Sequence, residues 1–348
     1  MTETSESTTV VTLAQLRREF AKHGWTRKPT ARIVMELAVH LLTIVAGAAM
    51  YFAHWPLPLR VIGIAVSAFG CVAVASNSHT SSHYATSSKR WVNEALTFFG
   101  YAFVLGLSAL FWWKDHGEHH AAPNVIGLDD DFDYRPFFNI DAAAMPAPGL
   151  RSWYYRKIQR YLIGFAALML GFNLQRRGTT WLAMQWRKPT RGVVLDSALV
   201  IAHFGLLVAV PCYFLGTGTF LTFYCLRMLL VSGGLFSILA PAHFPTEAVL
   251  LNQSTAAGLS HGELQTLTTI NYSGGRLLQW ITSGLGYQIE HHLFPEIGHP
   301  RYKEISPLVE EFCQATALPH RTYPFPKALA ESFRVFAVPK DAWEREGK

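Results

Sequence analysis

Three short histidine clusters stand out in this 348-residue sequence. Within each cluster the histidines are spaced so that one face of an α-helix can present them to a common point. Neutral imidazole is the commonest protein ligand of first-row transition metals, and Glu or Gln can occupy remaining positions. The candidate ligands are His79 and His83, then His116, His119 and His120, and finally Gln288, His291 and His292. A single pair of this kind is usually a polar surface feature, but three clusters in one chain predict a shared metal centre.

The order of these clusters, and the long apolar segments between them, resemble the histidine boxes of the membrane fatty acid desaturase family. In the third box Gln288 stands in place of the usual first histidine, and residues 287–295 read Tyr-Gln-Ile-Glu-His-His-Leu-Phe-Pro. This run is similar to the front-end acyl desaturase branch, as are the surroundings of the second box, from Trp112 to Asn124. The resemblance covers residues 31–324 and is more specific to the superfamily than to a substrate.

The resemblance implies a di-iron centre held almost entirely by histidines, with O2 as co-substrate. Desaturases of this type carry one more histidine near the end of the fourth span, which corresponds to His243. With the boxes this makes eight histidine ligands, and Gln288 would be a weaker ninth ligand or one that acts through water. Removing hydrogen from an unactivated methylene needs an oxidant stronger than any side chain, and paired irons that activate O2 provide one.

Residues near the boxes could support such a centre. Metal-binding imidazoles generally donate their second N–H to a carboxylate or carbonyl, and the nearest candidates in sequence are Asn77, Asp115, Glu118, Asn124 and Glu290. A long substrate also requires an apolar tunnel, which could be lined by Trp112, Trp113, Tyr287 and Leu293.

The composition indicates a membrane protein. Half of the residues are hydrophobic and only 16% are charged, against roughly 25% in an average globular chain. The net charge of +6 arises from basic residues in connecting segments, so we expect an anionic membrane surface as their partner and no nucleic acid. The four cysteines have no CxxC spacing and predict neither a disulfide framework nor a zinc site.

Four apolar segments are long enough to cross a hydrocarbon core of about 30 Å at about 1.5 Å per residue. They cover residues 33–55, 59–77, 193–215 and 219–242, and short loops join them into two hairpins. Residues 91–113 are equally apolar, but a single crossing there would put the first two boxes on opposite sides of the bilayer. We therefore expect this segment to lie in the interface or to re-enter, and the shorter run 161–172 to be interfacial.

The predicted fold class is an all-α integral membrane protein with four transmembrane helices, interfacial helices and a helical cytosolic cap that carries the di-iron site. Residues 1–30 would form a cytosolic tail with an interfacial helix, residues 31–324 the desaturase domain, and residues 325–348 a C-terminal cytosolic tail. The active site and both termini would lie on the cytoplasmic side.

Several ionisable residues fall outside the boxes. His203 and Arg227 lie deep in predicted spans and are functional candidates for that reason, whereas His40 is expected to be a packing residue. His299 is interpreted as a rim residue. The acidic run at 129–133 reads as a solvated loop, with docking of a basic electron donor as the alternative.

The leading functional prediction is an O2-dependent desaturase of a long acyl chain attached to lipid or coenzyme A. The segment before the first span is too short for a fused b-type cytochrome, so electrons would come from a separate ferredoxin or b-type cytochrome and its reductase. A related di-iron hydroxylase or ketolase of lipids or carotenoids is the closest alternative. A histidine-rich metal transporter is a more distant one, because it would place its ligands at mid-membrane.

Overall fold

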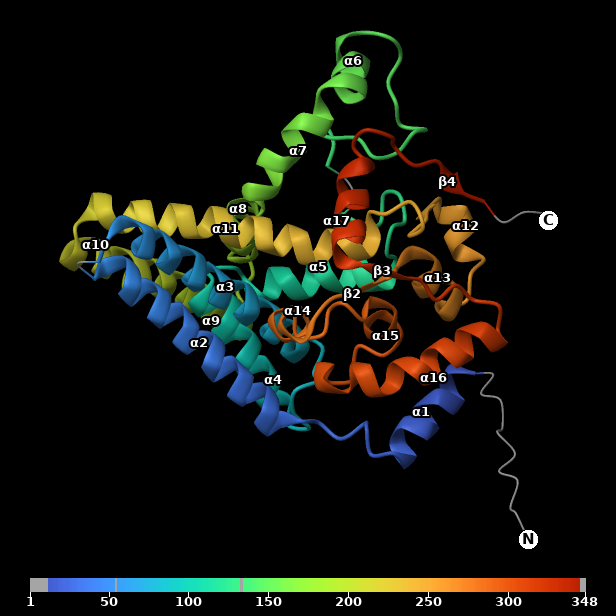
Figure 1. Cartoon of the computed structure of the whole chain (residues 1–348), viewed down its shortest axis with the longest axis horizontal. Coiled ribbons are helices and arrows are strands. Elements are labelled where there is room, and N and C mark those ends of the chain that lie inside the picture. The colour runs from blue at the N-terminus through green and yellow to red at the C-terminus, as the bar shows by residue number, and fades with distance from the viewer. Residues whose placement is uncertain (1–11, 54, 132–133, 345–348) are drawn as a thin grey trace.

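The computed structural model describes residues 12–53, 55–131 and 134–344, and most of them are helical (Figure 1). The first half contains helices α1 (Leu13–Lys22), α2 (Thr30–Phe52), α3 (Leu57–Ser82), α4 (Arg90–Thr97), the π-helix η1 (Phe98–Val104), α5 (Ala109–Ala121), α6 (Leu150–Lys157), α7 (Gln159–Leu168) and α8 (Leu170–Gln185). The second half contains α9 (Arg191–Ala202), the π-helix η2 (His203–Ala209), α10 (Val210–Leu215), α11 (Thr217–His243), α12 (Gln253–Ala257), α13 (His261–Thr268), α14 (Arg276–Ile281), α15 (Gln288–Leu293), the 3-10 turn η3 (His299–Arg301), α16 (Tyr302–Ala315) and α17 (Phe325–Arg334).

Two small parallel strand pairs join the end of the chain to the region between α11 and α15. Strand β1 (Leu250–Leu251) pairs with β4 (Ala342–Trp343), and β2 (Asn271–Ser273) pairs with β3 (Thr322–Pro324). The C-terminal segment therefore folds back over the helices that carry the third histidine box.

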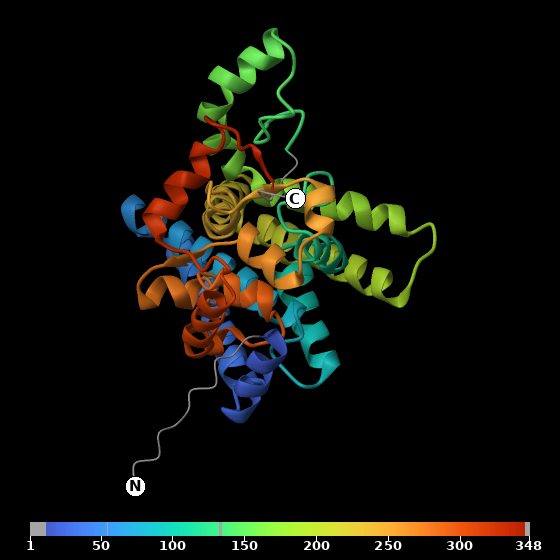
Figure 2. The same ribbon diagram turned by 90° about the vertical axis from the view of Figure 1, so that its right-hand side faces the viewer.

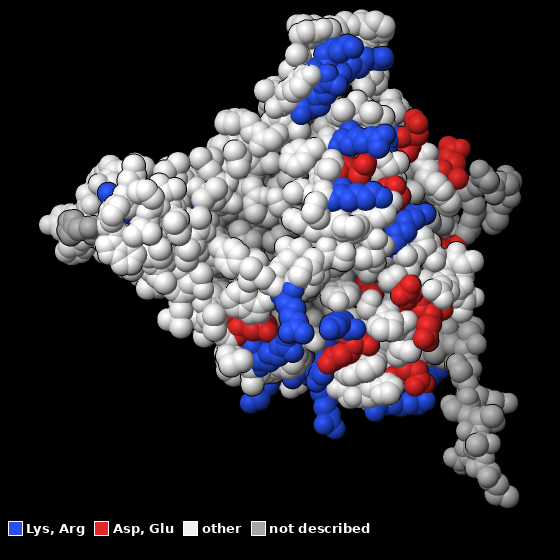
Figure 3. All heavy atoms as spheres, in the orientation of Figure 1, with Lys and Arg blue, Asp and Glu red and all other residues white. Residues whose placement is uncertain are grey.

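Four helical segments are long and apolar enough to cross a membrane: Thr30–Phe52, Leu57–Ser82, Arg191–Leu215 and Thr217–His243. They coincide closely with the four spans expected from the sequence. Figure 3 shows that the end of the molecule formed by these helices is almost free of charged side chains, while Lys, Arg, Asp and Glu gather at the opposite end. This separation is what a lipid environment requires.

Small residues let α2 and α3 approach closely along their length. A Cβ atom on Gly47 would lie 2.3 Å from the backbone nitrogen of Ser67, and one on Gly63 would lie 2.7 Å from the carbonyl oxygen of Gly47. In a bilayer the hydrophobic effect does not drive helices together, and close backbone contact at small residues is a usual way for apolar helices to associate there. This contact holds α3, whose other end carries the first box, against α2.

The apolar segment predicted to re-enter is broken in the structure. The helical pair Arg90–Val104 and Ala109–Ala121 bends by 111°, so α5 turns back toward the end of α3. The start of α5 is capped from α9: Asp196 accepts hydrogen bonds from the Ser108 hydroxyl (2.6 Å) and from the N–H groups of Ala109 (3.1 Å) and Leu110 (3.0 Å). These bonds satisfy donors that a helix start leaves open.

The end of η1 is satisfied by side chains from two other helices. The imidazole Nδ1 of His203 lies 2.9 Å from the carbonyl oxygen of Phe103, and Gln175 donates to the carbonyl of Leu105 at 2.9 Å. His203 and Gln175 also share the hydroxyl of Tyr224. Irregular backbone at membrane depth is tolerated only when its polar groups are paired in this way. His203, a functional candidate in the sequence, thus has a structural role at the break.

The two ends of the described chain pack onto the body of the protein. Leu16 and Phe20 of α1 are fully buried in a cluster with Ile289, Leu293 and other residues of α15 and α16. Protein therefore covers the apolar face of the helix that was expected to be interfacial. At the other end, Phe336 is fully buried in the cluster that also contains residues of α7 and α11.

Candidate metal centre

Four helices bring the predicted histidines to one place. The first box ends α3, the second lies on α5, His243 ends α11, and the third box is on α15. Their ring nitrogens form two groups in which all ligand atoms lie within 4.8 Å of one another. The larger group is His79, His83, His116, His120 and His291, and the smaller is His119, His243 and His292.

The larger group is tightly packed. Nε2 of His116 lies 2.8 Å from Nε2 of His79 and 2.9 Å from Nε2 of His83. Nε2 of His291 lies 3.0 Å from Nε2 of His120. The two groups adjoin each other, since the rings of His120 and His292 stack with centroids 4.2 Å apart. Residues separated by more than 200 positions in the chain therefore converge on neighbouring points.

The second ring nitrogens in the smaller group have partners of their own. Nδ1 of His119 lies 2.8 Å from Oδ2 of Asp129, Nδ1 of His292 lies 2.8 Å from Oε1 of Gln265, and Nδ1 of His243 lies 3.2 Å from the carbonyl oxygen of Thr268. In the larger group, Nδ1 of His291 contacts the hydroxyl of Tyr302 at 2.9 Å. Such partners fix the orientation of a ring and leave its Nε2 available to a metal.

Asp129 corrects the interpretation of residues 129–133 as a solvated loop. Residues 132 and 133 lie outside the described residues and Asp130 is exposed, but Asp129 is buried. Its Oδ2 contacts His119 and also accepts the N–H of Asn124 at 2.8 Å. Asp131 of the same run lines the cavity beside the histidines. Charge alone does not indicate which carboxylates of an acidic run turn inward.

The electrostatics of the histidines favour neutral rings in most positions. Burial, together with the neighbouring imidazoles, lowers the pKa of His116, His120, His291 and His292 well below the usual range. Burial also lowers the pKa of His83 to about 3. Burial acts in the same direction on His119, but the Asp129 carboxylate outweighs it and raises that pKa to about 9. Imidazole binds a metal ion in its neutral form, so the lowered pKa values keep most of these rings in the form that can bind a metal ion.

The donor set fits a pair of metal ions. Two adjoining groups of five and three imidazoles offer more nitrogen ligands than one ion takes, and imidazole suits iron, copper, nickel and zinc. Gln288 is buried and lines the same cavity as the histidines. All nine predicted ligands therefore lie at one site, with Gln288 at its wall.

An apolar cavity opens onto the histidines. Its volume is about 80 Å³, and its walls include Trp112, Leu174, Phe236 and Leu239. A second cavity of about 30 Å³ shares several of these walls and extends between α3, η1 and α11, lined by residues such as Leu235 and Ile238. The second cavity thus reaches Ala75 of α3 and Leu235 of α11, farther from the ends of these helices that carry the histidines.

The residues predicted to line a tunnel are only partly placed there. Trp112 lines both cavities. Leu293 is instead fully buried in the cluster between α1, α15 and α16, and Tyr287 packs against that cluster. The Trp113 indole donates to the carbonyl of Ser82 at 2.8 Å, which ties α5 to the first box. Leu170 and Phe236 do line the main cavity, but they belong to no sequence motif that predicts this position.

The predicted hydrogen-bond partners serve other residues. Asp115 pairs with Arg177 at 3.0 Å and Glu118 with Lys114 at 2.6 Å. The carboxylate of Glu290 contacts Asn271, Ser306 and His320, and Asn77 donates to the carbonyl of Ile33. Asn124 is the member of this set that supports the centre, through the N–H that it donates to Asp129.

Three other ionisable residues also have defined surroundings. His299 is buried rather than at a rim, with Nε2 2.8 Å from Glu36 and Nδ1 2.8 Å from Thr80. His40 is buried against Trp280, as expected of a packing residue. Arg227 lies over the rings of Phe223 and Tyr224, away from the histidines.

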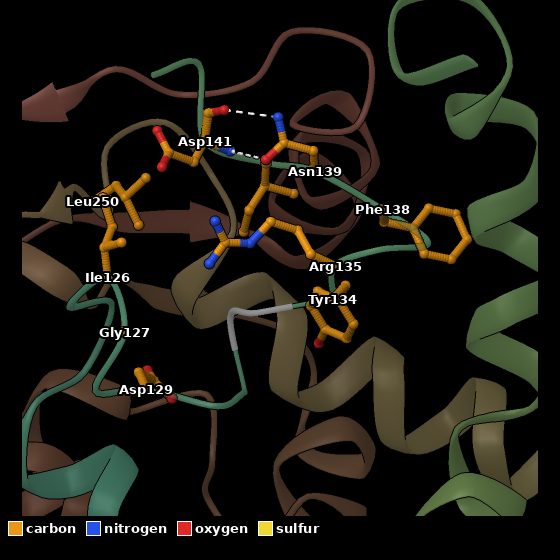
Figure 4. Close-up of a pocket in the computed structure, with 10 residues that line it drawn as sticks. Ile126, Gly127, Asp129, Tyr134, Arg135, Phe138, Asn139, Asp141 and Leu250 are labelled. Atoms are coloured by element: carbon orange, nitrogen blue, oxygen red, sulfur yellow. Dashed lines mark hydrogen bonds between the residues drawn. The ribbon is translucent and has the colours of Figure 1, made fainter. Parts of the chain in front are cut away.

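A smaller cavity of about 20 Å³ lies beyond Asp129 (Figure 4). The side chain of Arg135 extends across it between Asp141 and Tyr134, and Asp129 lies at its edge (Figure 4). Tyr134 lines this cavity and the main one. The carboxylate that orients His119 therefore also faces a second cavity, whose lining combines Arg135 and Asp141 with apolar residues.

Comparison with known proteins agrees with this geometry. The family described as fatty acid desaturase matches residues 53–324. The Delta(5) fatty acid desaturase fat-4 of Caenorhabditis elegans is 28% identical over 254 residues, which cover 70% of this chain and 55% of the relative. Fatty acid desaturase 3 of Homo sapiens is 26% identical over 270 residues, covering 76% of this chain and 58% of the relative. The chain thus spans a little over half the length of these relatives. By the extent of the family match, this chain belongs to the fatty acid desaturase family.

Proposed function

We propose that this protein is an O2-dependent fatty acyl desaturase that introduces a double bond into a long acyl chain at a histidine-ligated di-iron centre. The observation that carries the proposal is the convergence of eight imidazoles, in two adjoining groups, at the wall of an apolar cavity. Relatives named as Delta(5) and Delta(6) fatty acid desaturases support the same reaction class.

The larger group of histidines would hold one iron and the smaller group the other. When bound, the irons supply the oxidising power, with O2, that no side chain provides. The chain's own residues orient the ligands: Asp129 holds His119, Gln265 holds His292, and Tyr302 holds His291. Six of the eight histidines are buried and the other two are half-buried, which would help to keep bulk water away from the reacting carbons.

The acyl chain would lie in the two neighbouring cavities, which share Trp112, Leu174 and Leu239 as wall residues. Away from the histidines, most of the wall residues are apolar side chains of α3, α5, α8 and α11 together with η1, which match a hydrocarbon substrate. The position of the chain's end relative to the histidines would then decide which carbon pair is oxidised.

The four apolar helices would form two membrane hairpins, with the histidines and both termini on the cytoplasmic side. The support is that charged side chains, Lys and Arg among them, gather at the end of the molecule opposite the apolar helices (Figure 3), and that cytoplasmic segments tend to be basic. A separate ferredoxin or b-type cytochrome, with its reductase, would supply electrons, and the acyl group would be carried by lipid or coenzyme A.

Product analysis tests this function. Purified protein supplied with a donor, a reductase, O2 and a defined acyl substrate should yield a product lighter by two hydrogens. A product heavier by one oxygen would show that the reaction is hydroxylation. Product mass is the deciding measurement because both reactions begin with the same hydrogen abstraction. Metal transport without any O2-dependent lipid product would contradict the proposal altogether.

A further inference from the structure

Helices α6 and α7 form an arm, residues 150–168, that projects from the body of the molecule beside α11 (Figures 1 and 2). Its middle is fixed by Gln159, which donates to the carbonyls of Asn139 and Phe336 and accepts the N–H of Asn139. The buried residues Ile163 and Ala167 pack in one cluster with Phe236 and Ala240 of α11. The arm is therefore held in a defined position next to the end of a spanning helix.

The charge of the arm and its flanks has one sign. Residues 142–195 contain nine Lys and Arg and no Asp or Glu. Four of these basic side chains, Arg151, Arg156, Lys157 and Arg160, are exposed on the arm, and Figure 3 shows the blue patch on the projecting part. Such a surface attracts an anionic partner.

The arm also exposes an apolar stripe. Tyr161, Phe165 and Leu168 follow one another at spacings of four and three residues, which places them on one face of α7, and they are 68%, 68% and 38% exposed. This face lies opposite the one that packs on α11. On α6, Trp153 is 54% exposed. A soluble acidic protein would match the charges but would leave this stripe in water.

We propose that the arm lies in the membrane interface and binds anionic lipid. Tyr161, Phe165 and Leu168 enter the boundary between headgroups and acyl chains, and the basic side chains contact lipid phosphates, the arrangement typical of interfacial helices. The guanidinium of Arg160 lies over the ring of Tyr161 at 4.7 Å and donates to its hydroxyl at 2.6 Å. This pair bridges the apolar stripe and the headgroup layer. The proposal does not depend on the reaction that the histidines support.

The test places a nitroxide on the arm of the full-length protein, through Phe165→Cys, in a background where Cys212 and Cys225 are serine. The protein is reconstituted in phosphatidylcholine alone or mixed with phosphatidylglycerol, and relaxation by O2 is compared with relaxation by a water-soluble nickel chelate. The matched control is Lys303→Cys, an exposed position on α16. We expect O2 to dominate at position 165 and the nickel chelate to dominate at position 303.

The charge requirement has its own variant, in which Arg156, Lys157 and Arg160 are all replaced by Gln. Each positive charge removed from the arm weakens its attraction to an anionic membrane. It should therefore lower the ratio of lipid-exposed to water-exposed probe roughly fivefold in the phosphatidylglycerol mixture, and leave that ratio unchanged in phosphatidylcholine. Lys303→Gln should leave the ratio unchanged. The proposal is overturned if the nickel chelate reaches position 165 as readily as position 303. It is also overturned if protection appears only when an electron-donor protein is added.

Discussion

Single residues decide how the ligand imidazoles are held. Asp129 binds the ring of His119 and the N–H of Asn124 through the same oxygen, Oδ2, and it is buried. It lies only 10 residues after the ring that it orients, but in an acidic run whose charge predicts a solvated loop.

Asp129→Asn should weaken metal binding about 10- to 100-fold, the usual effect of losing the carboxylate behind a ligand histidine. An amide oxygen can replace one acceptor but not the charge that favours the Nδ1–H form of His119. Cobalt titration of metal-free protein measures the change. Asp130→Asn is the control, because Asp130 is exposed in the same run, and it should titrate as the native protein does. Equal affinities for Asp129→Asn and Asp130→Asn would contradict the assigned role.

At the scale of elements, the break between η1 and α5 sets the position of the second box. Gly106 lies in this break with φ +66°, and a Cβ atom there would lie 2.6 Å from Cδ2 of His203. Gly117 lies inside α5 with no neighbouring atom within 4 Å of a Cβ position. Replacing each glycine by alanine therefore compares a position where a Cβ atom clashes with one where it has open space.

Gly106→Ala should destabilise the protein by at least about 1–2 kcal/mol, because alanine pays for the left-handed conformation and also displaces His203. Gly117→Ala should stabilise α5 by about 0.5–1 kcal/mol. Thermal unfolding of detergent-solubilised protein, followed by tryptophan fluorescence, measures both. The same melting temperature for the two variants would show that the break is not held as described.

The long apolar helices and the convergence of the box histidines could be predicted from the sequence, but the parts that fix them could not. Apolar runs of sufficient length identify α2, α3 and α11, and box spacing identifies His116, His119 and His120. The caps at the break come from Asp196 and Gln175, far away in the chain, and single polar residues in apolar segments carry no periodic signal. Gln265 and Tyr302 likewise gain their roles only when α13 and α16 pack against α15.

At the scale of the whole molecule, the C-terminal segment closes over the end of α11. Lys340 is buried and its ammonium donates to the carbonyls of His243, at 3.1 Å, and Ala248. Its backbone pairs with Ile140 and Ala142. One side chain near the end of the chain thus stabilises the turn that follows a predicted ligand.

Lys340→Met roughly keeps the size of the side chain but leaves these carbonyls without their N–H donor. We expect a loss of about 1–3 kcal/mol in the free energy of unfolding and weaker metal binding. Lys303→Met, at an exposed site, should stay within about 0.5 kcal/mol of the native protein. Denaturant titration in detergent compares the two. A native-like midpoint for Lys340→Met would mean that the C-terminal segment does not hold the His243 turn.

The most direct measurement of the central proposal is the number of irons per chain in purified, active protein, by mass spectrometry of the metal together with Mössbauer spectroscopy. We predict two irons per chain. His292→Ala, which removes one of three imidazoles from the smaller group, should carry fewer and form no product. His261→Ala, an exposed histidine outside both groups, should keep two. One iron per chain in fully active protein, or undiminished iron and turnover in His292→Ala, would contradict the account.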